Sequence, residues 1–380
     1  MAAQKKKISP KFSPMTVIMV VFFLFFLLRP LATLITDYWW FEHLGYASVF
    51  ATQFSARLLL FAATAVLVMA FLSGTVFLAT RKKEKTFISR RFKIFAASVF
   101  AAVTGVVLSG YWEVFYLYKN MVPFPLADPI FGKNLSFYVF TLPLWNIIVS
   151  VCLATAAAAI ILVAVSALDA FIKELLSGKP YRTPEGIEVL PRQEQGFSRV
   201  WERVSAGIMI QLALLSALVF ALLAVRHYLA RFSILYSSTG VVYGAGYTDR
   251  MIILPAHTLL VLVCAGSALA LLGAAAAGVL QRAGAGSGGT KKGKSLLFSV
   301  LPVCLVVYAV VLIGGTIILP GIVQSVTVSP NELVVEQPYI ENSIRFTRYG
   351  YGLTNVTEID YAVGQESLSV DEDSFASMRV

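Results

Sequence analysis

The sequence predicts an all-α membrane protein, a polytopic bundle of seven transmembrane helices. Three observations predict this fold class: seven long apolar stretches, a composition with few charges, and basic residues that gather in alternate loops. Hydrophobic residues make up 58% of the 380 residues and charged residues only 14%, whereas a soluble domain has about 25% charged residues. A chain this apolar needs the bilayer as its solvent.

Each apolar stretch is long enough to cross the bilayer, which takes about 20 apolar residues in a helix. Helices are expected because every backbone amide in lipid must be hydrogen-bonded within its own segment. The sequence also lacks the alternating ten-residue pattern of a membrane β-barrel. The expected spans are 11–29 with an apolar continuation to 35, 57–81, 93–113, one within 134–168, 204–225, one within 251–280, and 296–319.

The distribution of Lys and Arg predicts the orientation. Most of the 31 basic residues lie in the N-terminal segment and in the loops after the second, fourth and sixth spans. By the positive-inside rule, the N-terminus is cytoplasmic and the C-terminal segment is extracytoplasmic. The net charge of +10 is then explained by the basic cytoplasmic segments, which also attract anionic lipid head groups. No nucleic-acid-binding motif accompanies it, so nucleic acid is not an expected partner.

The chain is expected to divide into a transmembrane domain, 1–319, and the start of an extracytoplasmic soluble region, 320–380. The second part is polar and acidic, and about 60 residues make a marginal domain. We therefore expect it to be the beginning of a longer, truncated region or a tail held by a partner. The first span lacks a cleavage site after its long apolar core and is expected to be a retained signal-anchor.

Titratable residues near the predicted outer face form a candidate polar site. Three of them lie within seven residues in the first outer loop, and two follow the third outer loop. The alternative for the first loop is an aromatic belt at the membrane interface. His257 is the one ionisable residue inside a predicted span, and its alternative role is a hydrogen bond to a neighbouring helix. The candidate residues are Asp37, Glu42, His43, Asp249, Arg250 and His257.

The three outer loops are dense in aromatics, Gly and Pro and poor in charge, which predicts a packed cap on the outer face. The alternative is that the rings lie at the lipid head groups. The glycines at 240–246 lack the Lys-Ser/Thr that completes a phosphate loop, so they do not indicate a nucleotide site. The aromatic residues expected to pack in the cap are Trp39, Trp40, Phe131, Tyr236 and Tyr247.

Small residues recur every four positions in the sixth predicted span. Such a stripe allows another helix to approach closely, either within the bundle or in a homo-oligomer or partner interface. The three cysteines all lie inside predicted spans without metal-ligand spacing, so no metal, cofactor or disulfide is expected. The stripe consists of Gly266, Ala270, Ala274 and Gly278.

Four loop motifs, in this order, carry a resemblance to a known family. They are WWFEHLGYASVF, DPIFGKNLSFYVFTLP, LYSSTGVVYGAGYTD and PNELVVEQPYIENSIRFTRYGYGL, within residues 37–353. Together they resemble the bacterial membrane proteins of uncharacterised protein family 0182. The resemblance implies a multi-pass protein of the bacterial inner (plasma) membrane with a large extracytoplasmic C-terminal part. It implies no catalytic residues.

The function that these observations favour is a non-enzymatic membrane scaffold that anchors an extracytoplasmic domain or envelope complex. The alternative is a transporter or channel for a small solute, and the third reading is an extracytoplasmic membrane-bound enzyme. A transporter needs a continuous polar cavity, whereas a scaffold has a dry core packed with Leu and Ala. The expected partners are the lipid bilayer and either a second copy of the chain or an envelope protein.

Overall fold

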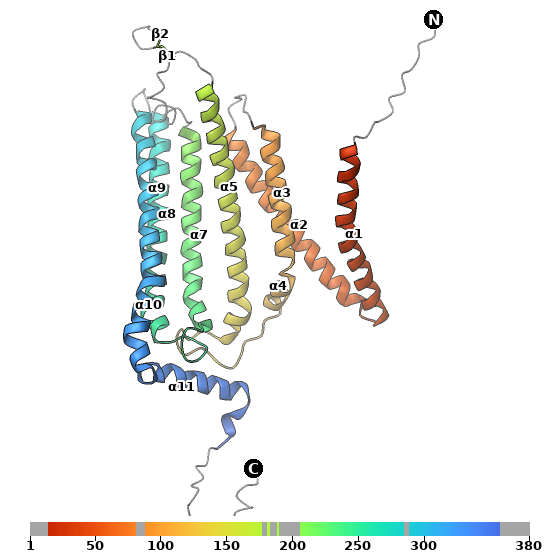
Figure 1. Cartoon of the computed structure of the whole chain (residues 1–380), viewed down its shortest axis with the longest axis vertical. Helices are drawn as coiled ribbons and strands as arrows, with labels where there is room; N and C mark the ends of the chain where they lie inside the picture. Colours follow the sequence, from red (N-terminus) through yellow and green to blue (C-terminus); the bar gives the residue numbers. More distant parts are fainter. Residues whose placement is uncertain are drawn as a thin grey trace, which may run out of the picture.

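The computed structural model is an elongated helical bundle whose long helices run alternately in opposite directions (Figure 1). It describes residues 14–80, 88–176, 181–182, 188–189, 206–284 and 289–357. The long helices are α1 (Pro14–His43), α2 (Ala47–Ala79), α3 (Arg90–Ser109), α5 (Leu142–Leu176), α7 (Ala206–Ser233), α8 (Leu254–Gly284) and α9 (Gly289–Ile313). The shorter elements are α4 (Trp112–Lys119), α10 (Leu319–Val323), α11 (Glu332–Gly350) and the two-residue antiparallel strands β1 (Tyr181–Arg182) and β2 (Glu188–Val189).

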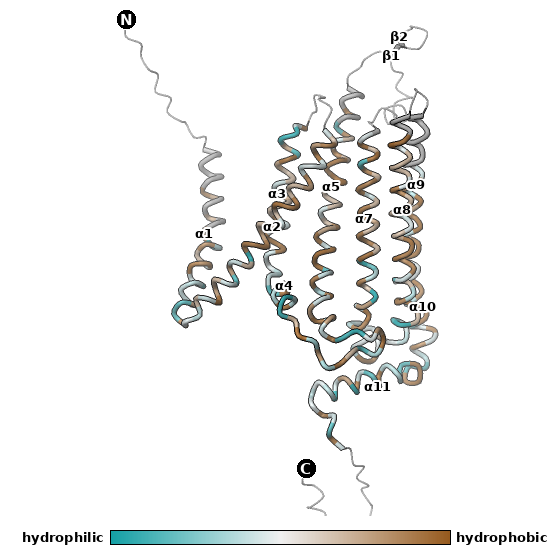
Figure 2. The backbone as a smooth tube through the Cα atoms, turned by 180° about the vertical axis from the view of Figure 1, so that it is seen from behind, coloured by the Kyte–Doolittle hydropathy of each residue, from teal (hydrophilic) through white to brown (hydrophobic). Residues whose placement is uncertain are grey.

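Within the described residues, six helical segments are long and apolar enough to cross a membrane, and the prediction of an α-helical membrane protein is confirmed to that extent. Apolar residues run along most of their length (Figure 2). The first expected span, 11–29, corresponds to α1, and its crossing of the membrane stays a prediction. This helix stands to one side of the bundle and packs on α2 (Figure 1).

Two predicted span boundaries are wrong because charged residues were taken as helix ends. α2 begins at Ala47, ten residues before Arg57. The Arg57 guanidinium lies 5.8 Å from the centre of the Trp112 ring, so its charge is accommodated inside the helix by an aromatic face. The third predicted span started at Lys93, whereas α3 begins at Arg90 and buries the Lys93 side chain.

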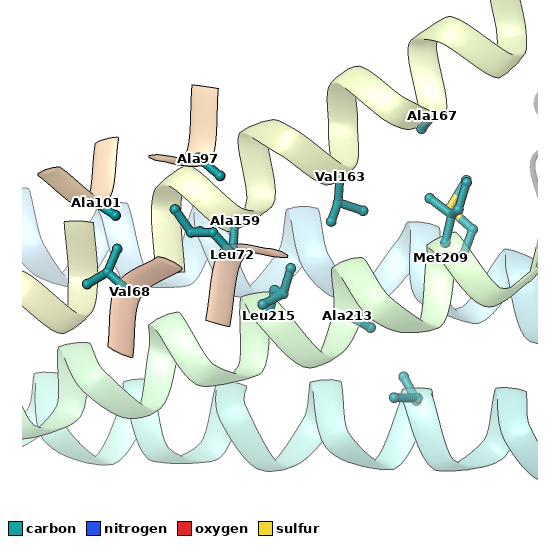
Figure 3. Packing of buried hydrophobic residues seen from close by; sticks show 13 residues of the cluster. Val68, Leu72, Ala97, Ala101, Ala159, Val163, Ala167, Met209, Ala213 and Leu215 are labelled. Atoms are coloured by element: carbon teal, nitrogen blue, oxygen red, sulfur yellow. The ribbon is translucent and has the colours of Figure 1, made fainter. Parts of the chain in front are cut away.

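The helices pack in a chain of neighbours. α2 packs against α3 and α5, α5 against α7, α7 against α8, and α8 against α9. The largest buried cluster lies where α2, α3, α5, α7 and α8 meet, and Figure 3 shows its small side chains between the ribbons. Lipid gives no hydrophobic driving force between helices, so close contact of small residues supplies much of the attraction. Ala97, Ala101, Ala159 and Ala213 provide that contact.

The two ends of the bundle differ. α2, α5 and α8 end, and α3, α7 and α9 begin, at one end of the bundle (Figure 1), and these helix ends adjoin the basic segments of the sequence. We call the opposite end the α11 end. There the helix of α9 continues through the π-helical turn η5 (Gly314–Ile318), α10 and the turn η6 (Gln324–Val328). The chain then turns, and α11 lies across the end of the bundle (Figure 1). Residues 358–380 of the predicted second region lie outside the described residues.

Candidate functional site

Asp128 organises the loop that leads into α5 at the α11 end. Its side chain is only 4% exposed. The Oδ1 atom accepts hydrogen bonds from the backbone N–H groups of Ile130 (2.9 Å) and Phe131 (2.6 Å). The Oδ2 atom accepts from the Lys133 N–H (2.8 Å) and from the Tyr138 hydroxyl (2.7 Å). Four donors therefore satisfy one buried carboxylate and fix the loop to the π-helical turn η1 (Phe137–Thr141) that precedes α5.

This loop packs against the end of α7. Gly132 has a φ of +64°, a conformation that non-glycine residues rarely adopt, and it closes the turn after Phe131. The Phe131 ring meets Phe232 of α7 edge to face, with centroids 4.9 Å apart. The Tyr236 hydroxyl donates to the Tyr138 carbonyl oxygen over 2.9 Å. Aromatic contacts and one hydrogen bond thus connect α5 to the segment after α7.

A second polar cluster joins α8 to α11. Asp249 is buried in the π-helical turn η4 (Asp249–Ile253), and its Oδ2 accepts from the Gly246 N–H over 3.1 Å. Both carboxylate oxygens of Glu336, on α11, accept from the Tyr247 N–H, at 3.0 and 3.1 Å. Glu336 is 3% exposed. A buried carboxylate without donors would be costly, so these backbone groups hold α11 in place.

The junction has further contacts. The Thr248 hydroxyl donates to Gln324 Oε1 over 2.6 Å, and Arg250 hydrogen-bonds Tyr339 of α11. A Cβ placed on Gly246 would lie 3.0 Å from Glu336 Oε1, so glycine allows the carboxylate to approach the backbone there. The loop before α8 is therefore closed by groups from the region that follows α9. We call this cluster the α11 junction, and its residues are Gly246, Tyr247, Thr248, Asp249, Arg250, Gln324, Glu336 and Tyr339.

A third cluster lies inside the bundle, about two turns from the α11 end. His227 of α7 is buried, and its Nδ1 lies 3.2 Å from Nδ1 of His257 of α8. The Nε2 atom of His227 lies 3.2 Å from the Tyr308 hydroxyl of α9. The alternative role foreseen for His257, a hydrogen bond to a neighbouring helix, is what its position provides.

A buried ion pair lies at the opposite end. Lys93 Nζ is 3.3 Å from Asp169 Oδ2, which joins the start of α3 to the end of α5. The Ile88 N–H, in the segment before α3, points to the other carboxylate oxygen at 3.4 Å. The pair therefore connects two helices and the loop that leads into one of them.

The structure does not bring the six candidate polar residues together. Asp37, Glu42 and His43 are exposed at the end of α1, where the Tyr38 hydroxyl contacts Glu42 at 3.4 Å. α1 packs on α2, whereas α8, which carries His257 and follows the turn of Asp249, stands on the other side of the bundle (Figure 1). The candidate site thus separates into an exposed group on α1, the α11 junction and the histidine cluster.

The aromatic cap is wrong for its first two members. Trp39 and Trp40 are 62% and 61% exposed on α1, which fits the alternative of rings at lipid head groups. Phe131 and Tyr247 are partly buried in the loops at the α11 end. Tyr236 is exposed, but its hydroxyl donates to the Tyr138 carbonyl oxygen in η1.

The small-residue stripe on α8 does not form one contact. Ala274 is buried and a Cβ on Gly278 would meet Ile210 of α7 at 3.4 Å, whereas Gly266 and Ala270 are exposed. An α-helix advances about 40° beyond a full turn every four residues, so a four-residue repeat drifts around the helix. Within the described chain, Ala274 and Gly278 therefore contribute to the bundle, and a role of the whole stripe in an interface with another chain stays a prediction.

Sequence reasoning missed Lys93, Asp169, Asp128 and Glu336. Asp128 had a local signal, because Asp followed by Pro and a later Gly is typical of a side chain that caps its own turn. Lys93 and Asp169 carry opposite charges at the same end of two apolar stretches, which also could have indicated a pair. Glu336 had no signal, because its partner lies 89 positions earlier in the chain.

The described residues offer little that could hold a metal or a large ligand. No group of three or more His, Cys, Asp or Glu side chains among them is placed to bind a metal ion. A cavity of about 330 Å³ lies beside α4, between aromatic side chains that include Trp112, Tyr116, Phe124 and Phe140. It is open to the surface, and its lining residues lie in α4, in the segment that follows α4 and in η1.

Comparison with protein families gives a match over nearly the whole chain. The model of an uncharacterised protein family, UPF0182, matches residues 14–380. The chain belongs to this family. The resemblance carried by the four loop motifs is thereby confirmed.

Several relatives show how much of a family member this chain represents. A UPF0182 protein of Cupriavidus necator is 32% identical over 87% of this chain and 34% of its own length. One of Methanospirillum hungatei is 30% identical over 90% of this chain and 36% of its own length, and one of Thermobifida fusca is 28% identical over 91% and 32%. The chain therefore spans about a third of the length of the relatives it matches. No solved structure matches the chain.

Proposed function

We propose that this chain is a multi-pass membrane scaffold that holds an extracytoplasmic region through the α11 junction. The observation that carries the proposal is the buried Glu336 carboxylate, which bonds the first helix after the spans to the backbone of Tyr247. If α11 were part of a flexible tether, it would not be expected to bury a carboxylate side chain against the bundle. The contacts of the junction support a role in positioning the region that follows α11.

The interior of the bundle supports an anchor over a transporter. Leu72, Val163 and Ala159 are completely buried where α2 meets α5, and Leu260 and Leu271 fill the centre of α8. A solute path needs polar groups that line a continuous cavity. The buried residues named above are instead apolar, which supports a scaffold.

The proposed orientation places the α11 end outside the cytoplasm. The helix ends next to the basic loops all lie at the other end, and Lys and Arg are enriched on the cytoplasmic side of membrane proteins. We place the protein in the bacterial cell membrane with α1 as a seventh span. Because the relatives are about three times as long, the region that follows α11 in them would begin outside.

Hydrogen exchange with variants of α11 tests the proposed anchor. Glu336→Ala removes the acceptor of the Tyr247 N–H, so the amides of 332–350 and 244–249 should exchange faster. Glu341→Ala is the matched control, because Glu341 lies on the same helix but is exposed and bonds only to Gln337 in the described structure. Unchanged exchange in the Glu336 variant would mean that α11 is not held at the junction.

A flux measurement separates the scaffold from the transporter. The purified chain is reconstituted into vesicles loaded with K⁺ and with a fluorescent pH indicator. A scaffold leaves the leakage of K⁺ and of protons equal to that of vesicles without protein. If the leakage rises in proportion to the amount of inserted protein, the protein is a transporter or channel and the scaffold proposal is wrong.

A further inference from the structure

The histidine cluster is a chain of polar groups that the proposed scaffold does not use. It takes one residue from each of three helices: His227 from α7, His257 from α8 and Tyr308 from α9. His227 is 6% exposed and is the middle member. His257 and Tyr308 are only partly buried, so both ends of the chain reach the surface of the bundle.

The geometry restricts where the protons can be. Two Nδ1 atoms 3.2 Å apart form a hydrogen bond only if one carries a proton and the other accepts. If the Nδ1 of His227 carries the shared proton, the Nε2 of His227 is unprotonated and accepts a hydrogen bond from the Tyr308 hydroxyl. If the Nδ1 of His257 carries the shared proton, the Nε2 of His227 is protonated and donates to the Tyr308 oxygen. The Nε2 of His257 is then unprotonated. Both arrangements are neutral and keep both hydrogen bonds.

We propose that His227, His257 and Tyr308 form a site that binds one proton in the membrane bundle. In the second arrangement, the bare Nε2 of His257 takes a proton from a hydronium ion, so that one O–H bond breaks, one N–H bond forms, and water and an imidazolium result. The Nδ1 proton of His257 can then pass to Nδ1 of His227, which moves the charge inward and breaks neither hydrogen bond. A second proton would put N–H groups on both Nδ1 atoms, and their bond would be lost.

The surroundings decide how far the proton can go. Among the described residues, the groups outside the cluster that act on it electrostatically are Arg226 on α7, whose charge opposes the bound proton, and Cys264 on α8 near Tyr308. α5 contributes the apolar Val149 and Leu153 next to the following turn of α7. Farther along α8, away from the α11 end, Leu260 and Leu271 are completely or almost completely buried.

The proposed proton path is therefore short and starts at the α11 end. His257 lies eight positions after Asp249, which is about 12 Å along a helix. Protons would reach it from the α11 end and would not pass on through the apolar centre. This inference is independent of the scaffold proposal, and either one can be correct when the other is wrong.

Nitrogen NMR of the intact chain tests the inference directly. The sequence has three histidines, and His43 is exposed on α1. A His43→Gln variant labelled with ¹⁵N-histidine therefore shows only His227 and His257, and the buried cluster is left unaltered. The pH is lowered from about 8 to about 4, which brackets the usual pKa of histidine.

The expected result is a scalar coupling between the two Nδ1 nuclei that persists while one proton is taken up per pair. The signals of both rings should move together in that step, and the coupling should disappear when a second proton binds. Independent titration of the two rings, absence of the coupling at every pH, or no proton uptake while the coupling persists would each overturn the proposal.

A second variant separates the shared proton from simple packing. Tyr308→Phe keeps the ring but removes the oxygen that accepts from protonated His227, so the bound proton should move toward His257 with the Nδ1 coupling retained. Leu305→Ala, an exposed position on the same helix, is the control and should leave the signals in place. If Tyr308→Phe leaves the distribution of the proton unchanged, the tyrosine is not part of the site.

Discussion

The Lys93 ammonium lies 3.3 Å from the Asp169 carboxylate, and the two side chains are 2% and 1% exposed. A pair so deeply buried gains little net stability over apolar residues, because both ions lose their hydration. Removal of one partner is strongly destabilising, because it leaves the other charge buried in an apolar environment without a counter-ion. The pair therefore makes the packing of α3 on α5 specific, and its two members depend on each other.

Asp169→Asn is expected to destabilise the bundle by about 3–5 kcal/mol, because the Lys93 charge stays buried without its counter-ion. The double variant Lys93→Met with Asp169→Leu should range from neutral to about 4 kcal/mol more stable than the natural chain. Thermal unfolding in detergent measures both. Arg91→Met is the control for loss of a basic residue at an exposed position. Equal stability of the single variant and the natural chain would contradict the assigned burial of the pair.

The sequence was sufficient for the class of the fold and for the approximate position of six spans. Hydropathy is summed over about 20 residues, so a single polar residue changes the sum for a span only slightly. The ends were harder. A lone charge such as Arg57 or Lys93 marks the end of a span only if it has no partner inside the bundle, and the Trp112 ring and Asp169 provide such partners.

The candidate site was predicted least well, because its contacts join distant segments. The four oxygen contacts of Asp128 come from the next ten residues and have a local pattern. The bond from Tyr247 to Glu336 and the meeting of His227 with His257 depend on how whole helices pack. Nothing in the spacing of those residues along the chain specifies that they meet.

Asp128→Ala should destabilise the loop before α5 by about 2–3 kcal/mol, because three backbone N–H groups and the Tyr138 hydroxyl lose their acceptor. Asp37→Ala is the matched control at an exposed site and should stay within about 0.5 kcal/mol of the natural chain. Chemical unfolding of the detergent-solubilised protein gives both values. Faster amide exchange should be confined to residues near 128–138, and an effect spread equally over the bundle would argue against a local role.

Single cysteines at the two ends test the proposed orientation. In a variant without the three natural cysteines, Arg91→Cys lies next to the basic loops and Thr354→Cys lies beyond α11, and both positions are exposed. An impermeant thiol reagent should label only position 354 in spheroplasts, and position 91 only after lysis. Labelling of position 91 before lysis would reverse the orientation and place the α11 junction in the cytoplasm.

Two adjacent glycines give a sharp test of the contact between α8 and the end of α9. A Cβ on Gly315 would lie 2.8 Å from the Cβ of Ala256, whereas a Cβ on Gly314 would have nothing within 4 Å. Gly315→Ala should therefore push the helices apart and cost about 1–3 kcal/mol, as overpacking does. Gly314→Ala adds the same methyl group to the same turn and should be neutral or slightly stabilising, because alanine favours the helical backbone.

The readout is the difference between the two glycine variants in thermal unfolding, since composition, expression and detergent are the same for both. The contact lies between His257 and the α11 junction along α8, so Gly315→Ala should also speed amide exchange at 244–249. Double substitution with Ala256→Gly should restore stability by removing the opposing Cβ. If Gly315→Ala and Gly314→Ala unfold at the same temperature, α8 and η5 do not approach as closely as the structure places them.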